Sequence, residues 1–265
     1  SSSTTQSVVV TDTESPVILP PLSVSSVVDA GSCTAQVSIS AVSVTDNCSV
    51  SSITNDHTGT SDASGTYPLG TTTVTWTATD IYSNTSTTTQ SITITDNEDP
   101  TITTSSVNQT SDTGSCTALV TVAAPSTSDN CAVQSVVNDY NNTSDASGTY
   151  PLGTTTVIWT VTDNSGNTDT DIQSITVTDD EDPSITTTGV VNATNDSGQC
   201  KATVTLSSPT TSDNCSVASV TSDAPGNSLY NVGTTTVTWT VTDIHGNSSS
   251  TTQSVVVTDT ESPVI

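Results

Sequence analysis

One phrase of eleven residues decides the fold, because it occurs three times with few changes. Its copies are GTTTVTWTATD at Gly70–Asp80, GTTTVIWTVTD at Gly153–Asp163 and GTTTVTWTVTD at Gly233–Asp243. In the first copy Val74, Trp76 and Ala78 alternate with threonines, which is the two-residue period of a strand with one buried face. Threonine is β-branched and carries a hydroxyl group, so it suits the solvated face of such a strand. The phrase therefore predicts an amphipathic β-strand in each of three repeats.

Further markers recur around each copy of the phrase. Two cysteines precede each tryptophan, and acidic linkers of the form TDxExP separate the repeats. The period is about 80 residues, which suits a series of small domains, each with its own core. A longer repeat surrounds these three, because residues 1–18 are identical to residues 248–265. We therefore expect the chain to be a window on a longer protein that repeats head to tail.

The linkers divide the chain into three predicted modules with a fragment at each end. Residues 1–11 match a closing strand and are expected to belong to a preceding repeat. The modules are predicted at residues 12–95, 96–178 and 179–258, and residues 259–265 are expected to begin the next repeat.

Alternating apolar residues also predict strands before and after the phrase. In the first module Ala35, Val37 and Ile39 form the buried face of one strand, and Ile92 and Ile94 that of the closing strand. One tyrosine precedes each Trp strand and is predicted to join the core; these residues are Tyr67, Tyr150 and Tyr230. No helical period competes with this pattern. Short strands separated by turn signals predict antiparallel β-sandwich modules.

The charge balance excludes several kinds of partner. Lys and Arg total 1, Asp and Glu total 27, and the formal net charge is −26. Nucleic acid and anionic membranes are excluded, since both are bound through clustered basic residues. No apolar run approaches the ~20 residues of a spanning helix, so we expect no membrane insertion in this segment.

The six cysteines predict structural cross-links. We expect one disulfide inside each module, in an oxidising compartment. The predicted pairs are Cys33 with Cys48, Cys116 with Cys131, and Cys200 with Cys215. Closing a loop of about 15 residues stabilises a domain by roughly 3 kcal/mol. A straight strand between the two cysteines would hold the sulfur atoms too far apart, so the segment must fold back or bulge. Zinc is the alternative, although two cysteines without a nearby histidine make a poor zinc site.

Taken together, these motifs resemble the hyalin repeat (HYR) module. In the first module the resemblance is carried by Gly31, Cys33, Ala35, Asp46 to Cys48, Tyr67 to Trp76, Asp80, Asn84, Asp96, Glu98 and Pro100. It covers nearly the whole chain three times. It implies an all-β fold of tandem immunoglobulin-like antiparallel β-sandwich modules, arranged as an elongated rod in an extracellular, adhesive protein. The family usually has further cysteines near positions 19 and 88, and their absence here leaves only the inner pair of each module to bond.

Acidic residues are expected to gather at the joints between modules. The linker, the turn before the second cysteine and the hairpin after the Trp strand should all lie at the entry pole of a module. Carboxylates at this density, with one lysine in the chain, favour Ca²⁺, which takes 6–8 oxygen ligands. The predicted ligands are Asp12, Glu14, Asp46, Asp80 and Asn84; Asp96, Glu98, Asp99, Asp129, Asp163 and Asn167; Asp179, Glu181, Asp182, Asp213, Asp243 and Asn247; and Asp259 and Glu261. The alternative is a solvated acidic turn that only keeps the protein soluble.

These features predict a structural role. We expect a segment of a long extracellular fibre or adhesin stalk, whose neighbours are further copies of the same repeat. No enzymatic activity is expected, because His57 and His245 are solitary and have no counterparts in the sibling modules. The alternative is a multivalent binding array that recognises a glycan or a surface protein. The exposed aromatic residues that such an array would use, Tyr82 and Tyr140, do not recur in all modules.

Overall fold

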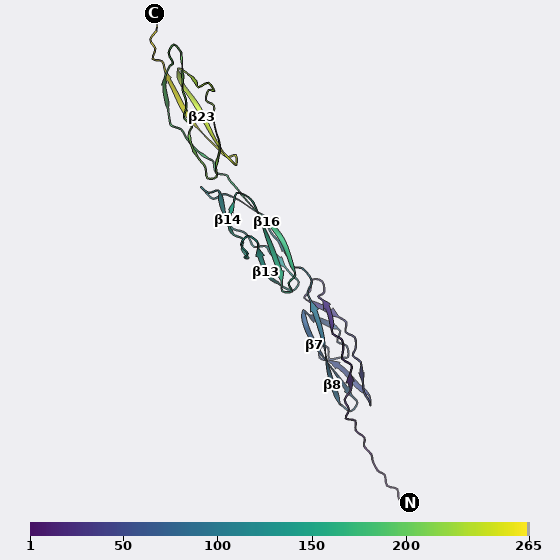
Figure 1. The fold of residues 1–265 in the computed structure, drawn as a ribbon. Helices are drawn as coiled ribbons and strands as arrows, with labels where there is room; N and C mark the ends of the chain where they lie inside the picture. Colours follow the sequence, from purple (N-terminus) through teal and green to yellow (C-terminus); the bar gives the residue numbers. More distant parts are fainter. Residues whose placement is uncertain (264–265) are drawn as a thin grey trace.

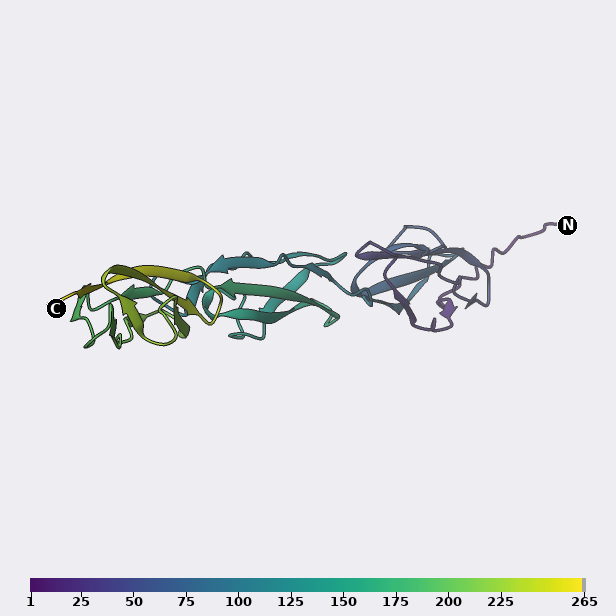
Figure 2. The same cartoon turned by 90° about the horizontal axis from the view of Figure 1, so that it is seen from above.

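The chain forms three β-modules that lie end to end in an elongated rod (Figures 1 and 2). The computed structural model describes residues 1–263, so the last two residues of the predicted fragment 259–265 lie outside the described part. The two termini lie at opposite ends of the rod (Figure 1). The described residues contain strands and no helix. The predicted elongated all-β architecture is confirmed.

Each module contains eight strands in the same order. In the first they are β1 (Val17–Ile18), β2 (Val24–Val27), β3 (Thr34–Val37), β4 (Val44–Thr45), β5 (Val50–Asn55), β6 (Gly65–Pro68), β7 (Gly70–Asp80) and β8 (Thr85–Thr95). In the second they are β9 (Thr101–Thr103), β10 (Val107–Thr110), β11 (Thr117–Val120), β12 (Ser126–Ser128), β13 (Val133–Asn138), β14 (Gly148–Pro151), β15 (Gly153–Asp163) and β16 (Thr168–Thr178). In the third they are β17 (Ser184–Thr186), β18 (Val191–Thr194), β19 (Lys201–Thr203), β20 (Thr210–Ser212), β21 (Val217–Ser222), β22 (Leu229–Asn231), β23 (Gly233–Asp243) and β24 (Ser248–Thr258).

A four-stranded sheet and two short strand pairs make up each module. In the first module the sheet has the order β2-β8-β7-β5, and β1 pairs with β4 and β3 with β6. All of these pairs are antiparallel except β2 with β8, which is parallel. A parallel pair was not expected. It arises because the chain enters at one pole and leaves at the other, so the second strand and the closing strand run in the same direction. The siblings repeat this pair as β10 with β16 and β18 with β24.

The predicted core residues are buried. Trp76 is 0 % exposed, and its ring N–H donates to Gln90 Oε1 at 3.0 Å. The Gln90 amide in turn donates to the Leu22 carbonyl at 2.8 Å, which ties the sheet to the β1–β2 connection. The Tyr67 hydroxyl donates to the Ala63 carbonyl at 2.6 Å. Each module has its own cluster of buried apolar residues, centred on Trp76, Trp159 and Trp239.

Residues 1–11 form no strand in this structure, and their assignment to the closing strand of a preceding repeat stays a prediction. Their twin, Ser248–Thr258, is the closing strand β24 and pairs with β23, whereas residues 1–11 form no strand. Val8 and Val10 are 79 % and 84 % exposed, although Val255 and Val257 are 0 % and 2 % exposed.

Candidate metal centres at the module joints

Three acidic clusters lie where the modules begin, and we call these places the first, second and third joints. Their members are Asp12, Asp46 and Asp80; Asp96, Asp129 and Asp163; and Asp179, Asp213 and Asp243. In each cluster one ligand atom per residue lies within 4.8 Å of the others. Each cluster takes one residue from the linker, one from the turn before the second cysteine, and one from the end of the Trp strand. The strand directions thus bring together the residues that the sequence placed at this pole.

The turn before the second cysteine fixes one carboxylate by its own backbone. At the second joint, Asp129 Oδ2 accepts the main-chain N–H groups of Cys131 at 2.8 Å and Ala132 at 2.7 Å. This is the local side-chain to backbone bonding that makes aspartate a turn former. Its other oxygen, Oδ1, is buried and has no hydrogen-bond partner.

The linker aspartate is fixed in the same way. Asp96 is the first residue after β8, and it is 8 % exposed. Its Oδ1 atom accepts the N–H of Glu98 at 3.1 Å and the side-chain amide of Asn130 at 3.2 Å. Its Oδ2 atom is buried without a partner. Two of the three aspartates thus use one oxygen for local structure and leave the other free.

The third aspartate closes the hairpin after the Trp strand. Asp163 is 0 % exposed. Its Oδ1 atom accepts the main-chain N–H groups of Ser165 and Asn167, both at 2.8 Å, and its Oδ2 atom accepts the Asn167 side-chain amide at 2.7 Å. Burial acts to raise the pKa of Asp163, but these hydrogen bonds outweigh it and hold the pKa below its usual value. The residue is therefore an anion at neutral pH.

Unpartnered buried oxygens are concentrated at the joints. Among the described residues, eight buried side-chain polar atoms lack a hydrogen-bond partner, and all but Ser86 Oγ belong to the joints. The seven are Asp12 Oδ2, Asp46 Oδ1, Asp96 Oδ2, Asp129 Oδ1, Asn130 Oδ1, Asp213 Oδ1 and Asn214 Oδ1. A buried acceptor without a partner costs about 1–3 kcal/mol, and more when it is charged. All seven are oxygen atoms, which are the ligands that Ca²⁺ takes.

An asparagine next to each second cysteine was missed as a site residue by the sequence analysis. The Asn130 amide donates to the Ser32 carbonyl of the preceding module at 3.1 Å, as well as to Asp96. Asn214 repeats both bonds, to the Ser115 carbonyl at 3.0 Å and to Asp179 at 3.1 Å. Its recurrence in the Asp-Asn-Cys motif of all three modules was the available signal.

The predicted asparagine ligands act as hydrogen-bond donors. The Asn84 amide donates to Asp80 Oδ2 at 2.7 Å and to the Asp12 carbonyl at 3.2 Å. Asn167 and Asn247 make the equivalent pairs of contacts. These residues hold the linker against the hairpin.

The predicted glutamate ligands lie outside the clusters. Both carboxylate oxygens of Glu98 accept the main-chain N–H of Gly31 at 3.0 Å, at the exit pole of the preceding module. Gly31 has a φ of 69°, in the left-handed region that glycine adopts without strain. Glu181 and Glu261 make the same contact with Gly114 and Gly198. Asp99 and Asp182 are exposed, as are Glu14 and Asp259, and none of these belongs to a cluster.

The third joint differs from its siblings by a histidine. His245 Nδ1 lies 3.2 Å from Asp179 Oδ2, the atom whose counterpart Asp96 Oδ2 has no partner. It is the one close contact between a basic side-chain nitrogen and a carboxylate oxygen within residues 1–263. The linker carboxylate oxygen that is unpartnered at the second joint is thus in contact with His245 at the third joint.

Disulfides join neighbouring modules, so the predicted bonds within modules are wrong. Cys33 is bonded to Cys131 and Cys116 to Cys215, with Cα atoms 4.7 Å and 4.9 Å apart. Cys48 and Cys200 are free. The physical reason is that the first cysteine of a module precedes β3 or its counterpart at the exit pole, whereas the second lies in the acidic turn at the entry pole. The two cysteines of one module thus lie at opposite ends of it. Cys131 instead packs against the core of the first module.

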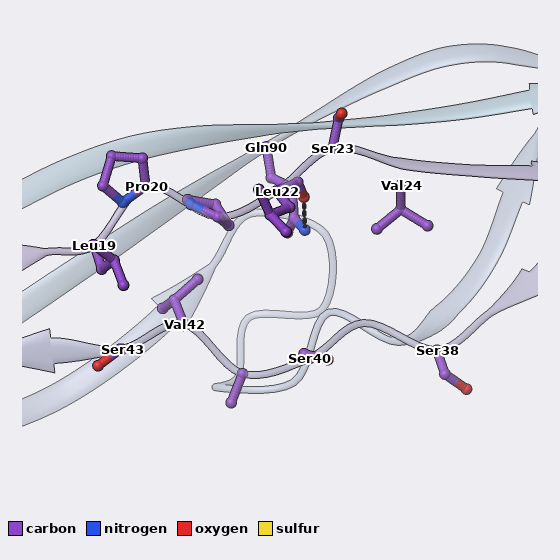
Figure 3. A pocket seen from close by; sticks show the side chains of 12 residues that line it. Leu19, Pro20, Leu22, Ser23, Val24, Ser38, Ser40, Val42, Ser43 and Gln90 are labelled. Carbon is purple, nitrogen blue, oxygen red and sulfur yellow. Dashed lines mark hydrogen bonds between the residues drawn. The ribbon is translucent and has the colours of Figure 1, made fainter.

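An open recess on the first module offers no catalytic groups. It has a volume of 460 Å³ and lies between residues 19–24 and residues 38–43 (Figure 3). Its lining is aliphatic, prolyl, seryl and amide, without an aromatic or charged side chain. Leu22 at its edge is 87 % exposed. Recognition of a glycan or surface protein stays a prediction. Among the described residues no helix is long and apolar enough to span a membrane.

Sequence comparison finds one family and two curated relatives. The HYR domain profile matches residues 11–94 and 178–257. Hyalin of Strongylocentrotus purpuratus is 31 % identical over 222 residues, which cover 78 % of this chain and 18 % of that protein. Hyalin of Lytechinus variegatus is 31 % identical over 231 residues, which cover 83 % of this chain and 42 % of that protein. The chain thus spans less than half the length of these relatives.

Structural comparison returns tandem-domain proteins at low similarity. Protocadherin Gamma B2 extracellular cadherin domains 3–6 align over 91 % of this chain and 73 % of that one, with 14 % identity and a TM-score of 0.38. Mouse Cadherin-23 EC22–24 aligns over 92 % and 99 %, with 13 % identity and a TM-score of 0.38. Sidekick-1 immunoglobulin domains 1–5 align over 93 % and 59 %, with 13 % identity and a TM-score of 0.37.

Proposed function

The chain belongs to the HYR domain family, and on that premise we propose that it is a segment of an extracellular structural or adhesive rod whose joints are stiffened by Ca²⁺. The observation that carries the proposal is the convergence of seven unpartnered buried oxygens on the joints. Three carboxylates within 4.8 Å repel one another, and a divalent cation removes both the repulsion and the unmet hydrogen-bonding capacity.

At the second joint, the proposed ligands come from four residues. Asp96 Oδ2, Asp129 Oδ1 and Asn130 Oδ1 are free, and Asp163 completes the carboxylate cluster. Main-chain carbonyls and water would supply the remaining oxygens that Ca²⁺ requires. In extracellular modules such sites typically bind Ca²⁺ with a Kd of about 10⁻⁴–10⁻³ M.

A cation at this place would link two modules. Asp96 follows directly on β8, the closing strand of the first module, whereas Asp129 and Asp163 belong to the second. An ion held by all three therefore restrains the direction in which the second module leaves the first. Without the ion, the linker aspartate and the two turns repel each other, and the joint opens more easily.

The disulfide forms a second, independent brace. Cys131 lies two residues from Asp129, and its partner Cys33 lies at the exit pole of the preceding module. Asn130 adds a hydrogen bond to the Ser32 carbonyl. The cation and the disulfide thus hold the same two poles together by different chemistry. Disulfides persist in oxidising environments, which supports an extracellular location.

Small-angle X-ray scattering of the 265-residue chain tests the proposal. We expect a longer maximum dimension and a narrower distance distribution in millimolar Ca²⁺ than in EGTA. Asp129→Asn should abolish part of this difference, because it removes one free anionic oxygen of the second joint. Asp99→Asn is the matched control, since it removes one exposed negative charge in the linker of the same joint. Identical scattering with and without Ca²⁺ would refute the proposal.

A further inference from the structure

The two free cysteines lie at opposite ends of the rod. Cys48 lies at the entry pole of the first module and Cys200 at the exit pole of the third. Each module contains strands of 11 residues, so three modules hold these sulfur atoms on the order of 100 Å apart. A disulfide requires Cα atoms within about 7 Å, so these two residues cannot pair within one copy of the chain.

Cys200 lies in the same backbone setting as the bonded Cys33. The Gln199 N–H donates to the Asp196 carbonyl at 2.9 Å, as the Ser32 N–H does to the Asp29 carbonyl. The carbonyl of Cys200 accepts the Val232 N–H at 3.1 Å, and that of Cys33 accepts the Leu69 N–H at 3.3 Å. The main chain around Cys200 is therefore hydrogen-bonded in the same way as the main chain around the disulfide-bonded Cys33.

Cys48 likewise lies in the setting of the bonded Cys131 and Cys215. Its main-chain N–H donates to Asp46 Oδ2 at 2.9 Å, and those of Cys131 and Cys215 donate to Asp129 and Asp213 at 2.8 Å and 2.9 Å. Both free cysteines are exposed. The main-chain hydrogen bonds around both free cysteines thus match those around their bonded siblings.

Each end of the rod also carries one half of the other hydrogen bonds that are found at a complete joint. At the exit pole of the third module Glu261 already accepts the Gly198 N–H at 2.9 Å, as Glu98 accepts that of Gly31. At the entry pole of the first module the Asn47 amide donates to Asp12 at 3.4 Å but lacks the carbonyl partner that Asn130 finds in Ser32. The two halves carry one linker sequence, because residues 248–263 repeat residues 1–16.

We propose that Cys200 of one copy forms a disulfide with Cys48 of the next copy of this chain, arranged head to tail, so that every joint of the array is covalently braced. The pair would be the third member of the series that begins with Cys33–Cys131 and Cys116–Cys215. The proposal rests on the joints' backbone geometry and does not depend on a bound cation.

Forming the bond converts two thiols to one disulfide with loss of two protons and two electrons. The electron acceptor is a protein disulfide or a low-molecular-weight disulfide, which is reduced to two thiols as the new bond forms.

The test is a double-length protein, residues 1–265 followed by residues 19–265 of a second copy, which continues the repeat without a break. It is refolded in a glutathione redox buffer, its thiols are counted, and its peptides are mapped without reduction. We expect two free thiols, the first Cys48 and the last Cys200, and a peptide that links the inner Cys200 to the inner Cys48. Four free thiols, or a bond between Cys33 and Cys48, would overturn the proposal.

Two controls locate the bond and the source of the second copy. Cys200→Ser in the first copy alone should raise the thiol count from two to three, while leaving the other disulfides in place. A single-length chain refolded in the same way distinguishes the two sources of the second copy. Monomers that keep both thiols would assign the pairing to copies within one continuous chain, and a disulfide-linked ladder joined through Cys200 and Cys48 would assign it to copies on separate chains. A ladder joined through other cysteines would contradict it.

Discussion

Removal of the Cys33–Cys131 bond should destabilise the rod far more than removal of the two free cysteines. The bond spans 98 residues of the chain. In the chain-entropy model a loop of this size restricts the unfolded state by about 4.7 kcal/mol, and measured losses on removing native disulfides are about 2–5 kcal/mol. The variant Cys33→Ser/Cys131→Ser is therefore compared with Cys48→Ser/Cys200→Ser, which makes the same chemical change at the two free residues.

Urea unfolding followed by tryptophan fluorescence measures this difference, because each module carries one buried Trp. We expect the midpoint for the first and second modules to fall in the disulfide variant, while the third module, which lies outside that loop, keeps its midpoint. The control variant should unfold like the parent protein. Equal midpoints for the two double variants would refute the reasoning that the braces lie between modules.

Three further predictions concern single positions. Gly114→Ala should cost about 1–2 kcal/mol in thermal unfolding, because Gly114 has a φ of 72°, whereas Gly226→Ala, whose φ is not positive, should cost less. Hydrogen bonds from the side chain and the main-chain N–H of Thr104 lower the pKa of Asp171. This carboxylate therefore stabilises the folded state above its unfolded pKa near 3.8, and the stabilisation is lost as the pH falls through the lower folded pKa. Asp171→Asn should reduce this dependence of the melting temperature on acid pH, measured in a pH series of melting curves. His245→Ser should strengthen Ca²⁺ binding at the third joint, measured by calcium titration, because it frees the linker carboxylate that His245 contacts.

The repeated phrases predicted the core of each module well. Trp76, Tyr67 and Ile92 are buried because a two-residue period assigns each side chain to one face of a strand, and this is local information. The parallel pairing of β2 with β8 could not be read in this way, since it depends on which strands become neighbours.

Strand direction explains why the sequence predicted the grouping of the joint aspartates but not the pairing of the cysteines. Counting reversals of the chain placed Asp12, Asp46 and Asp80 at one pole, and the structure brings them together. The same counting places Cys33 at the other pole from Cys48, so a bond inside the module was never geometrically available. A disulfide requires both cysteines at the same pole, which only neighbouring modules provide.

Equilibrium dialysis of the 265-residue chain against Ca²⁺ tests the central claim most directly. If the three acidic clusters are cation sites, the chain should take up three ions at millimolar Ca²⁺, Asp129→Asn should take up two, and Asp99→Asn should still take up three. Uptake no greater than that of a non-specific acidic protein of equal charge, or the same uptake by Asp129→Asn as by the parent chain, would contradict the account.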